Sequence, residues 1–496
     1  MNLTTTPLEN HEATIKVLKN EVAYLKEQLS WFQKQVFGQR SERIINENSD
    51  QLFLNLQIPT PPEPETKKIA AHSRQTKQKK SDKITFPENL PVERIFIDIK
   101  ETDKICPTTG KFLVKIGEEV SQKLAHKPGS YYIKEIIRPK YAMPKGAEET
   151  ILTADLPNSI LPRCKADESL LADILVRKFA DHLPLYRQSE ILSRENINIS
   201  RQTLSQWTVK CGLALKPIYD ELLNQVLQSK NVFIDEVPVD MLKPGEGKVH
   251  QAYMWVIVGG KDANPASRVY NFRTNRRHEN AAELLKNYHD GVVHSDKYGA
   301  YEALACQKKF VWCPCWVHIR RKFFEGEAGD PEFIKLILRK IKYIFMLDRV
   351  AWNRSEEERL RIRQEKEIPI IDELIILVKD RLQNGFNLPK SKFKESLGYF
   401  LGLVPYLKNY TNYAFSRLDN NVAERAVRPL AIGRKNWLFL GSEEGGEAAA
   451  VILSLVQTCR ALGVNPRDYL EDVMRRLMDH NAQKISELLP QNWISQ

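Results

Sequence analysis

Apolar residues near the start of the chain recur at alternating intervals of four and three, with charged and amide residues between them. The positions are Leu18, Val22, Leu25, Leu29, Phe32 and Val36. This spacing indicates a coiled-coil seam within an N-terminal helix over residues 1–48. About three heptads are marginal for an isolated coil, so an amphipathic helix docked on its own protein is the alternative. We favour the coil and predict that residues 15–36 join copies of the chain into a homo-oligomer.

The composition changes after this helix. A segment rich in proline, lysine, glutamine and serine predicts a flexible basic linker over residues 49–83, whose lysines either contact phosphates or are simply solvated. Short β-rich runs separated by turn residues then predict a small β domain over residues 84–150. Cys106 stands alone there, because a zinc site would need a second thiolate or imidazole two to four residues away and only Thr109 lies at that distance.

The periodicity becomes helical over residues 151–228. Two helices are predicted on either side of a break at residues 196–198, with Ser200 placed to cap the second. The inner face of the second helix consists of Leu204, Trp207 and Cys211. Its outer face offers candidate DNA contacts at Arg201, Gln202 and Gln206. Such a pair suits a helix-turn-helix motif, but any two packed helices give a similar pattern, so both interpretations stay open.

The pattern changes to β-strands in residues 229–325. Three consecutive strands, a helix, a fourth strand, a further helix and a last strand are predicted. The strands are expected at residues 232–238, 253–258, 267–272, 291–296 and 310–317, and the first helix at 280–288. This order matches an RNase H-like α/β core. Pro238 cannot continue a central strand, so we expect Asp235 near the end of the first strand.

Acidic residues close two of these strands. If the first and fourth strands are neighbours, Asp235 and Asp296 converge at one sheet edge, where their repulsion is costly unless a divalent cation such as Mg²⁺ neutralises them. Paired metals of this kind activate a hydroxyl nucleophile and stabilise the leaving oxygen of a phosphodiester. The best candidate for a third acid is Glu424. Its alternative role is that of a capping-box glutamate in a helix whose N-cap is Asn421.

Charge and composition narrow the choice of partners. Among 496 residues, 74 Lys and Arg against 63 Asp and Glu give a net charge of +11, so polyanions are the first partners to consider, with a merely soluble basic protein as the alternative. No apolar stretch approaches the roughly 20 residues that cross a bilayer, so no membrane partner is expected. Seven cysteines suit reduced thiols, and the first residues lack the pattern of a secretion signal. We therefore expect a cytoplasmic protein.

Five sequence strings, in one order along the chain, resemble those of a known family. They are DHLPLYRQ at 181–188, IDEVPV at 234–239, SDKYGAY at 295–301, CWVHIRRKF at 315–323 and, above all, NVAERAVRPLAIGRKNW at 421–437. The chain resembles the transposases of the insertion-sequence-66 family over nearly its whole length. The resemblance implies a DDE transposase with an RNase H-like core, in which Asp235, Asp296 and Glu424 are the catalytic acids and hold two Mg²⁺ ions per active site.

The resemblance also shapes the predicted domain organisation, which is that of a multidomain α/β protein. The long separation of the second and third acids predicts a helical insertion at residues 326–415, followed by a core-closing helix at 416–445 and a C-terminal helical region at 446–496. These join the N-terminal coiled coil, the small β domain and the helix-turn-helix-like region. Family members carry two cysteine pairs in the small β domain; three of the four are replaced here, by Thr109, Met143 and Gly146. This departure argues against zinc in that domain.

Basic residues surround the last two family strings. Phosphate contacts near the catalytic edge are expected from His318, Arg320, Arg321 and Lys322. The helix of the third acid extends this surface with Arg425, Arg428, Arg434 and Lys435, and Trp437 is a candidate for stacking on an unpaired base. A salt-bridged helix face is the competing explanation for each arginine. We interpret Cys313, Cys315 and His318 as packing, because three ligands leave a structural zinc site incomplete.

The expected function is therefore metal-dependent cleavage at the ends of a bacterial insertion sequence and transfer of the freed 3′-hydroxyl into target DNA. The expected partners are double-stranded DNA, as element ends and target, further copies of the chain, and accessory proteins of the same element. Two alternatives stay open. One is a catalytically decayed DNA-binding regulator, and the other is an RNase H-like nuclease that cleaves without strand transfer.

Overall fold

The computed structural model describes residues 158–242, 248–260, 266–307, 310–385 and 390–494, two short strands at 140–142 and 151–153, and the single residues Val22, Leu25, Gly129 and Tyr131. The chain divides into two compact units, residues 1–42 with 138–496, and residues 43–137. The predicted basic linker and nearly all of the coiled-coil seam and of the small β domain lie outside the described residues. Everything below concerns the first unit.

A short antiparallel pair precedes the helices. Strand β1 (Lys140–Ala142) pairs with β2 (Ile151–Thr153), with Tyr141 opposite Leu152.

The region between β2 and the first strand of the main sheet is helical, as the periodicity predicts. Its helices are α2 (Glu168–Phe179), α3 (Leu185–Arg194), α4 (Arg201–Ala214) and α5 (Lys216–Leu227). The predicted break and cap are present, since Asn196 adopts a left-handed conformation (φ 59°) and the Ser200 hydroxyl accepts the Thr203 amide at 3.1 Å. Leu204 and Cys211 are fully buried. The helix pair is therefore confirmed as a local structure.

Five strands form one mixed sheet in the order β5-β4-β3-β6-β7. The three long strands pair antiparallel, whereas β3, β6 and β7 run parallel. Their bounds are β3 (Asn231–Leu242), β4 (Val249–Gly259), β5 (Ser267–Arg273), β6 (Val292–Ser295) and β7 (Val311–Pro314), with α6 (His278–Leu284) and α7 (Gly299–Cys306) between them. The mixed α/β class is thus as expected.

Two predicted strand ends were wrong. Strand β3 runs four residues beyond Pro238, because β6 pairs with it only as far as Phe233 and leaves the rest of that edge free of a ladder. The backbone groups of the even-numbered residues point to this edge, so the missing Pro238 amide removes no bond to β4. The last strand ends at Pro314 rather than at residue 317, because Cys315 already serves as the N-cap of a helix.

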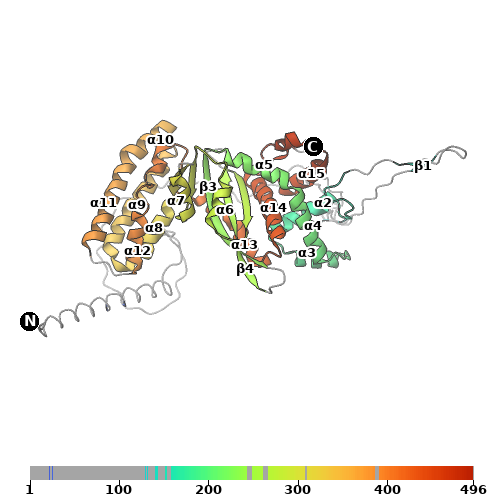
Figure 1. The fold of residues 1–496 in the computed structure, drawn as a ribbon, viewed down its shortest axis with the longest axis horizontal. Helices are drawn as coiled ribbons and strands as arrows, with labels where there is room; N and C mark the ends of the chain where they lie inside the picture. Colours follow the sequence, from blue (N-terminus) through green and yellow to red (C-terminus); the bar gives the residue numbers. More distant parts are fainter. Residues whose placement is uncertain are drawn as a thin grey trace, which may run out of the picture. The chain divides into compact units, whose positions relative to one another are not determined.

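Helices cover both faces of the sheet and one of its edges (Figure 1). Tyr270 and Asn271 are neighbours on β5 and point to opposite faces. The Tyr270 hydroxyl donates to the Ala426 carbonyl of α13 (Asn421–Trp437), whereas the Asn271 amide donates to Tyr219 of α5 at 2.9 Å. The sheet is therefore the middle of three layers.

The outer edge of β5 is closed by helix α14 (Glu443–Leu462). The hydroxyls of Ser454 and Thr458, one turn apart, accept the Tyr270 amide at 2.8 Å and the Arg268 amide at 2.9 Å. A helix that supplies these hydroxyls replaces the missing strand and protects the edge from pairing with another chain. Every residue from Ala448 to Cys459 is buried, as expected for a helix whose middle is enclosed on all sides.

A helical segment separates β7 from α13. Its elements are α8 (Trp316–Glu325), α9 (Pro331–Ala351), α10 (Glu356–Ile362), the π-helical η3 (Arg363–Glu367), α11 (Ile368–Asn384), α12 (Lys392–Leu401) and the short turns η2 (Glu327–Gly329) and η4 (Asn409–Asn412). One stripe of α9 is fully buried at Ile334, Ile337, Ile341 and Ile344. The three- and four-residue spacing explains why this segment packs as helices.

The chain ends in α15 (Pro466–Arg476), η5 (Leu477–Asp479) and η6 (Ala482–Leu488). Among the described helices, none combines the length and the apolar character needed to span a membrane.

Candidate active site

The parallel pairing of β3 and β6 brings two aspartates to one edge of the sheet. Phe233 lies opposite His294, and their rings stack at 4.6 Å on one face. Asp235 follows Phe233 by two residues, and Asp296 follows His294 by two residues. Because side chains alternate between faces, Asp235 lies on the face of the stacked rings. Asp296 follows the last residue of the parallel neighbour β6, and its charge acts on Asp235.

Helix α13 lies along the edge of β3 that β6 leaves open. The Asn420 side chain, just before the helix, donates to the Ile234 carbonyl at 2.8 Å. Farther along, Arg434 donates to the Pro238 carbonyl at 2.5 Å. Glu424 belongs to the stretch of helix between these two anchors, and Asp235 belongs to the stretch of strand between them. The contacts thus bring the helix of the third predicted acid against the strand of the first.

The capping-box alternative for Glu424 was wrong. The N-cap of α13 is Asn420, and its amide donates to the sulfur of Cys315 at 3.2 Å instead of to a glutamate. The Asn421 amide is taken by Asp419 at 3.1 Å. Glu424 is therefore left free for another role.

Electrostatics shows that the three acids lie close enough to influence one another. Burial raises the pKa of Asp235 to about 7, and the negative charges of Glu236, Asp296 and Glu424 add to this rise. Burial and Glu424 likewise raise the pKa of Asp296, against the opposing charge of Arg276. Carboxyl groups that resist ionisation together favour either a shared proton or a bound cation.

Two buried oxygens fit a cation. Oδ1 of Asp296 and Oε1 of Glu424 are buried without a hydrogen-bond partner among the described residues. Unpaired carboxylate oxygens in a low-dielectric site are unfavourable, and hard oxygen ligands are the ones that Mg²⁺ prefers. The donor set of Asp235, Asp296 and Glu424 therefore suits a divalent cation.

Glu236 is an acid of this site that our sequence analysis missed. It is 9% exposed, pairs with Arg276, and accepts the Tyr301 hydroxyl at 3.1 Å. The guanidinium of Arg276 also lies 4.3 Å from the ring centre of Tyr298. Glu236 points to the opposite face of β3 from Asp235, where Arg276 balances its charge. The charge of Asp296 acts on both acids, so Glu236 is electrostatically part of the site. The alternation along the strand gives the face, but no local signal identifies Arg276 as the partner.

His318 lies beside the third acid. Its Nδ1 is 3.9 Å from Oε1 of Glu424, and burial lowers its pKa, so the imidazole is neutral at physiological pH. The ligand atoms of Cys315, His318 and Glu424 all lie within 4.8 Å of one another. Burial raises the pKa of Cys315 to about 12, and its sulfur already accepts the Asn420 amide. Cys315 therefore acts as a protonated thiol that fixes the start of α13.

The predicted DNA-binding residues occupy several surfaces. Arg425, Arg428 and Lys435 are exposed on α13, and Arg321 is exposed on α8. Arg201, Gln202 and Gln206 are exposed on α4, a helix that packs on α14 and not at the acids.

Four further candidates already have protein contacts. Arg434 is the anchor on Pro238, and Lys322 pairs with Glu325 and Glu395. Trp437 is half-buried, with the Lys178 ammonium 5.9 Å from its ring centre. Arg320 is half-buried on α8 and engaged in an interaction within the protein.

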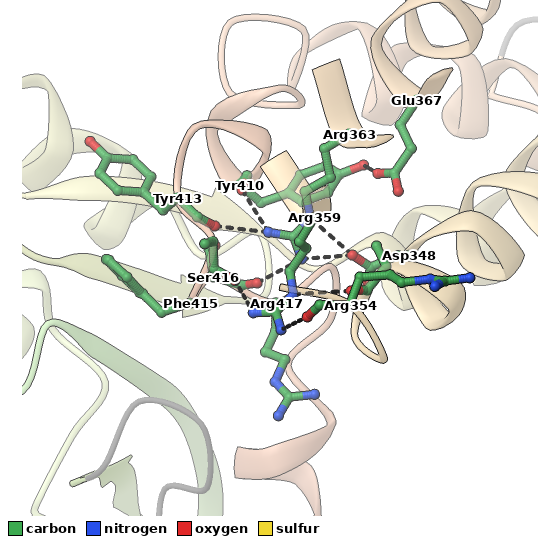
Figure 2. Close-up of polar contacts among 12 residues, drawn as sticks. Asp348, Arg354, Arg359, Arg363, Glu367, Tyr410, Tyr413, Phe415, Ser416 and Arg417 are labelled. Carbon is green, nitrogen blue, oxygen red and sulfur yellow. Dashed lines mark hydrogen bonds and ion pairs between the residues drawn. The ribbon is translucent and has the colours of Figure 1, made fainter. Parts of the chain in front are cut away.

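A buried ionic cluster joins the helical segment to the chain that leads into α13 (Figure 2). Arg363 is fully buried and donates to Asp348 at 2.6 and 3.0 Å. It also donates to the carbonyls of Tyr413 and Ser416 at 2.8 and 2.9 Å. Arg359 adds a bond to the Ala414 carbonyl at 2.8 Å. Two arginines therefore fix the path of residues 413–416.

Four sequence-family models match this chain, and each of them describes part of a transposase. The sequence model described as "Transposase IS66 family" matches residues 163–448, and "IS66 C-terminal element" matches 454–491. The "Transposase C of IS166 homeodomain" model matches residues 24–95, and the "zinc-finger binding domain of transposase IS66" model matches 103–144.

Similar full-length proteins occur in Sinorhizobium fredii (strain NBRC 101917 / NGR234). The uncharacterized protein y4jD is 30% identical over 96% of this chain and 94% of its own length. The uncharacterized protein y4hP is 31% identical over 95% of this chain and 89% of its own length.

Proposed function

Because the chain belongs to the IS66 family of transposases, we propose that it cleaves DNA at the ends of an insertion sequence and joins the freed 3′-hydroxyl to target DNA. The proposal is supported by three acidic residues that two parallel strands and one helix bring near one another. Two of them, Asp296 and Glu424, have a buried carboxylate oxygen without a hydrogen-bond partner among the described residues. A carboxylate set of this kind is what phosphodiester chemistry with two metal ions requires.

In this proposal each acid has its own position. Asp235 and Asp296 hold the cations from the sheet edge, and Glu424 completes the ligand set from α13. Bound Mg²⁺, two ions per site, supplies activation of the attacking hydroxyl and charge stabilisation at the leaving oxygen. The neutral His318 imidazole, beside Glu424, is available to orient a ligand or accept a proton.

The sheet supports an RNase H-like core. Strands β3, β4 and β5 pair antiparallel in sequence order. Strands β6 and β7 then add in parallel at the other edge of β3, so that β3 and β6, the first and fourth strands, are neighbours. We propose that β3 to β7 form this core, that residues 326–415 are its insertion, and that α3 and α4 bind DNA as a helix-turn-helix.

Residues 103–144 lack the ligands of a structural zinc site. Although the zinc-finger model matches there, this stretch contains one cysteine, Cys106, and one histidine, His126. A structural zinc site needs four ligands, so we propose that this domain folds without zinc.

The test is an assay of purified protein with Mg²⁺ and labelled element ends. Cleavage followed by joining supports the transposase. Cleavage without joining favours a nuclease, and binding alone favours a decayed regulator. Inverted repeats flanking the gene are the independent check, since a mobile element requires them and the two rivals do not.

A further inference from the structure

A cavity of about 330 Å³ lies at the first turns of α13, the helix that carries the third acid. Its wall includes Asn421, Val422 and Arg425 of that helix, Arg417 and Asp419 from the preceding segment, Arg268 of β5, and Asp348 and Trp352 from the end of α9. Glu424 and Arg425 are consecutive residues. The cavity therefore adjoins the candidate active site but is formed by different side chains.

Three guanidinium groups meet at this cavity, those of Arg268, Arg417 and Arg425. Neither Arg268 nor Arg425 has an ion-pair partner among the described residues. Burial lowers the pKa of Arg268, and the nearby charges of Arg460 and Arg425 lower it further. Positive groups that outnumber the carboxylates around them favour an anionic ligand.

The two carboxylates in the wall already have partners. Asp348 accepts two hydrogen bonds from the buried Arg363. Asp419 accepts the backbone amide of Asn421 at 3.1 Å and its side-chain amide at 2.7 Å. The charge of Asp348 is therefore balanced by Arg363, which is not one of the three cavity arginines. Asp419 keeps its charge, which acts on both Arg417 and Arg425, but one carboxylate balances only one of the three guanidinium groups. The cavity thus keeps an excess of positive charge.

Trp352 supplies a further donor but no stacking surface. The guanidinium carbons of Arg417 and Arg359 lie 3.6 and 3.9 Å from its ring centre. Two groups this close to one ring centre must occupy opposite faces, so a nucleobase cannot stack there. The indole Nε1 is buried without a hydrogen-bond partner among the described residues. A ligand that accepts hydrogen bonds fits this arrangement better than an aromatic one.

We propose that this cavity binds a backbone phosphate of the DNA strand adjacent to the phosphate that is cleaved. The inference rests on the proposed transposase function and adds Arg268, Arg417 and Trp352 to the DNA-contacting residues. Arginine forks match phosphate oxygens, and the volume accommodates a phosphodiester with its sugar. Because Asp348 belongs to α9 and Trp352 caps its end, a phosphate bound here also connects the helical segment to the helix of Glu424.

The experiment measures the salt dependence of DNA binding by the full chain. Fluorescence anisotropy with an element-end duplex, without divalent metal, gives the affinity between about 50 and 200 mM KCl. Arg268→Gln and Arg425→Gln are each expected to weaken binding roughly five- to tenfold and to reduce the slope of log K against log salt by about one. Arg361→Gln, an exposed arginine on α10 outside the cavity, is the matched control and should keep the original slope.

An unchanged slope in Arg268→Gln with intact folding would overturn the proposal. A site for free anions alone would also overturn it. In that case inorganic phosphate raises the melting temperature of the original protein but not of Arg268→Gln, while the salt slope of DNA binding is the same in both proteins. Cleavage is assayed separately with Mg²⁺. If the original protein does not cleave but its salt slope still differs from that of Arg268→Gln, the transposase proposal fails and the phosphate site stands. If the original protein cleaves but the two slopes are equal, the phosphate site fails and the transposase proposal stands.

Discussion

The side-chain amide of Asn420 donates to the carbonyl of Ile234 at 2.8 Å, and both groups are buried. This bond joins the start of the Glu424 helix to the residue before Asp235. Two residues that are 186 positions apart in the sequence thus determine how close the first and third acids come.

Replacing Asn420 with alanine is expected to loosen this junction. The buried Ile234 carbonyl loses its partner, which costs roughly 1–3 kcal/mol of unfolding free energy. Cleavage of labelled element ends should fall as well, because Glu424 loses its anchor. Urea denaturation and the cleavage assay measure the two effects. Asn436→Ala removes an exposed bond from the same helix, to His182, and should change neither; equal losses in both variants would contradict the assignment.

Asp296→Asn is expected to abolish cleavage while leaving the fold and DNA-end binding intact. Loss of a residue that hydrogen-bonds to a metal ligand already costs about 10- to 100-fold in activity, so loss of a ligand itself should reduce cleavage by at least about a hundredfold. The variant should melt no lower than the original protein without metal, because the Asp296 carboxylate is buried beside Glu424. Undiminished strand transfer by Asp296→Asn would refute its role.

The helical segment should show a specific pH dependence through Glu367. Burial and the charge of Asp348 raise the pKa of this glutamate to about 7, well above its value in an unfolded chain. The folded state therefore holds the proton more tightly, so the contribution of Glu367 to stability is largest below about pH 4 and is lost as the pH rises through 7.

Glu367→Gln tests this dependence. The amide keeps the shape, and its oxygen still accepts the Tyr410 hydroxyl, but it has no proton to lose. Between about pH 4 and 8 the original protein should lose roughly 3 kcal/mol of unfolding free energy relative to the variant. Parallel pH profiles from chemical denaturation would show that Glu367 does not titrate as expected.

Arg363→Met should destabilise the protein by about 3–5 kcal/mol, because Asp348 would remain buried without its partner. Combining it with Asp348→Leu removes the orphaned charge and should recover part of that loss. A double-mutant cycle by urea denaturation measures the coupling. Additive effects of the two changes would show that the pair is not coupled.

Deleting residues 1–48 is expected to yield a species of lower oligomeric order, because the apolar seam from Leu18 to Val36 is lost. Size-exclusion chromatography with light scattering reports the mass. Deletion of residues 1–14 alone keeps the seam and is the control. The same number of chains per particle in all three proteins would remove the seam as the site of self-association.

Local patterns predict much of this fold. Alternation and turn residues give the five strands in order, and the position of Ser200 gives the start of α4. The same patterns place the end of β3 wrongly at Pro238. The strand can continue there because its edge is open, and the open edge depends on how far β6 extends. The strand pairing supports the placement of Asp235 and Asp296 from sequence.

The third acid and the ionic cluster required other information. Spacing alone favours a cap for Glu424, and only the family resemblance selects it as a catalytic residue. No local signal distinguishes the buried Arg363 from an exposed arginine of an amphipathic helix. Its partners lie 15 to 53 residues away along the chain, so they become visible only once the chain is folded.

The order of these elements along the chain has a consequence for biosynthesis. A ribosome releases β3 and β6 first, then the whole helical segment, and only afterwards the helix with Glu424. A nascent chain, or one truncated by an early stop codon before residue 421, therefore carries two of the three acids and lacks the last. If the three acids act as proposed, such a fragment would have an incomplete ligand set and would not cleave DNA.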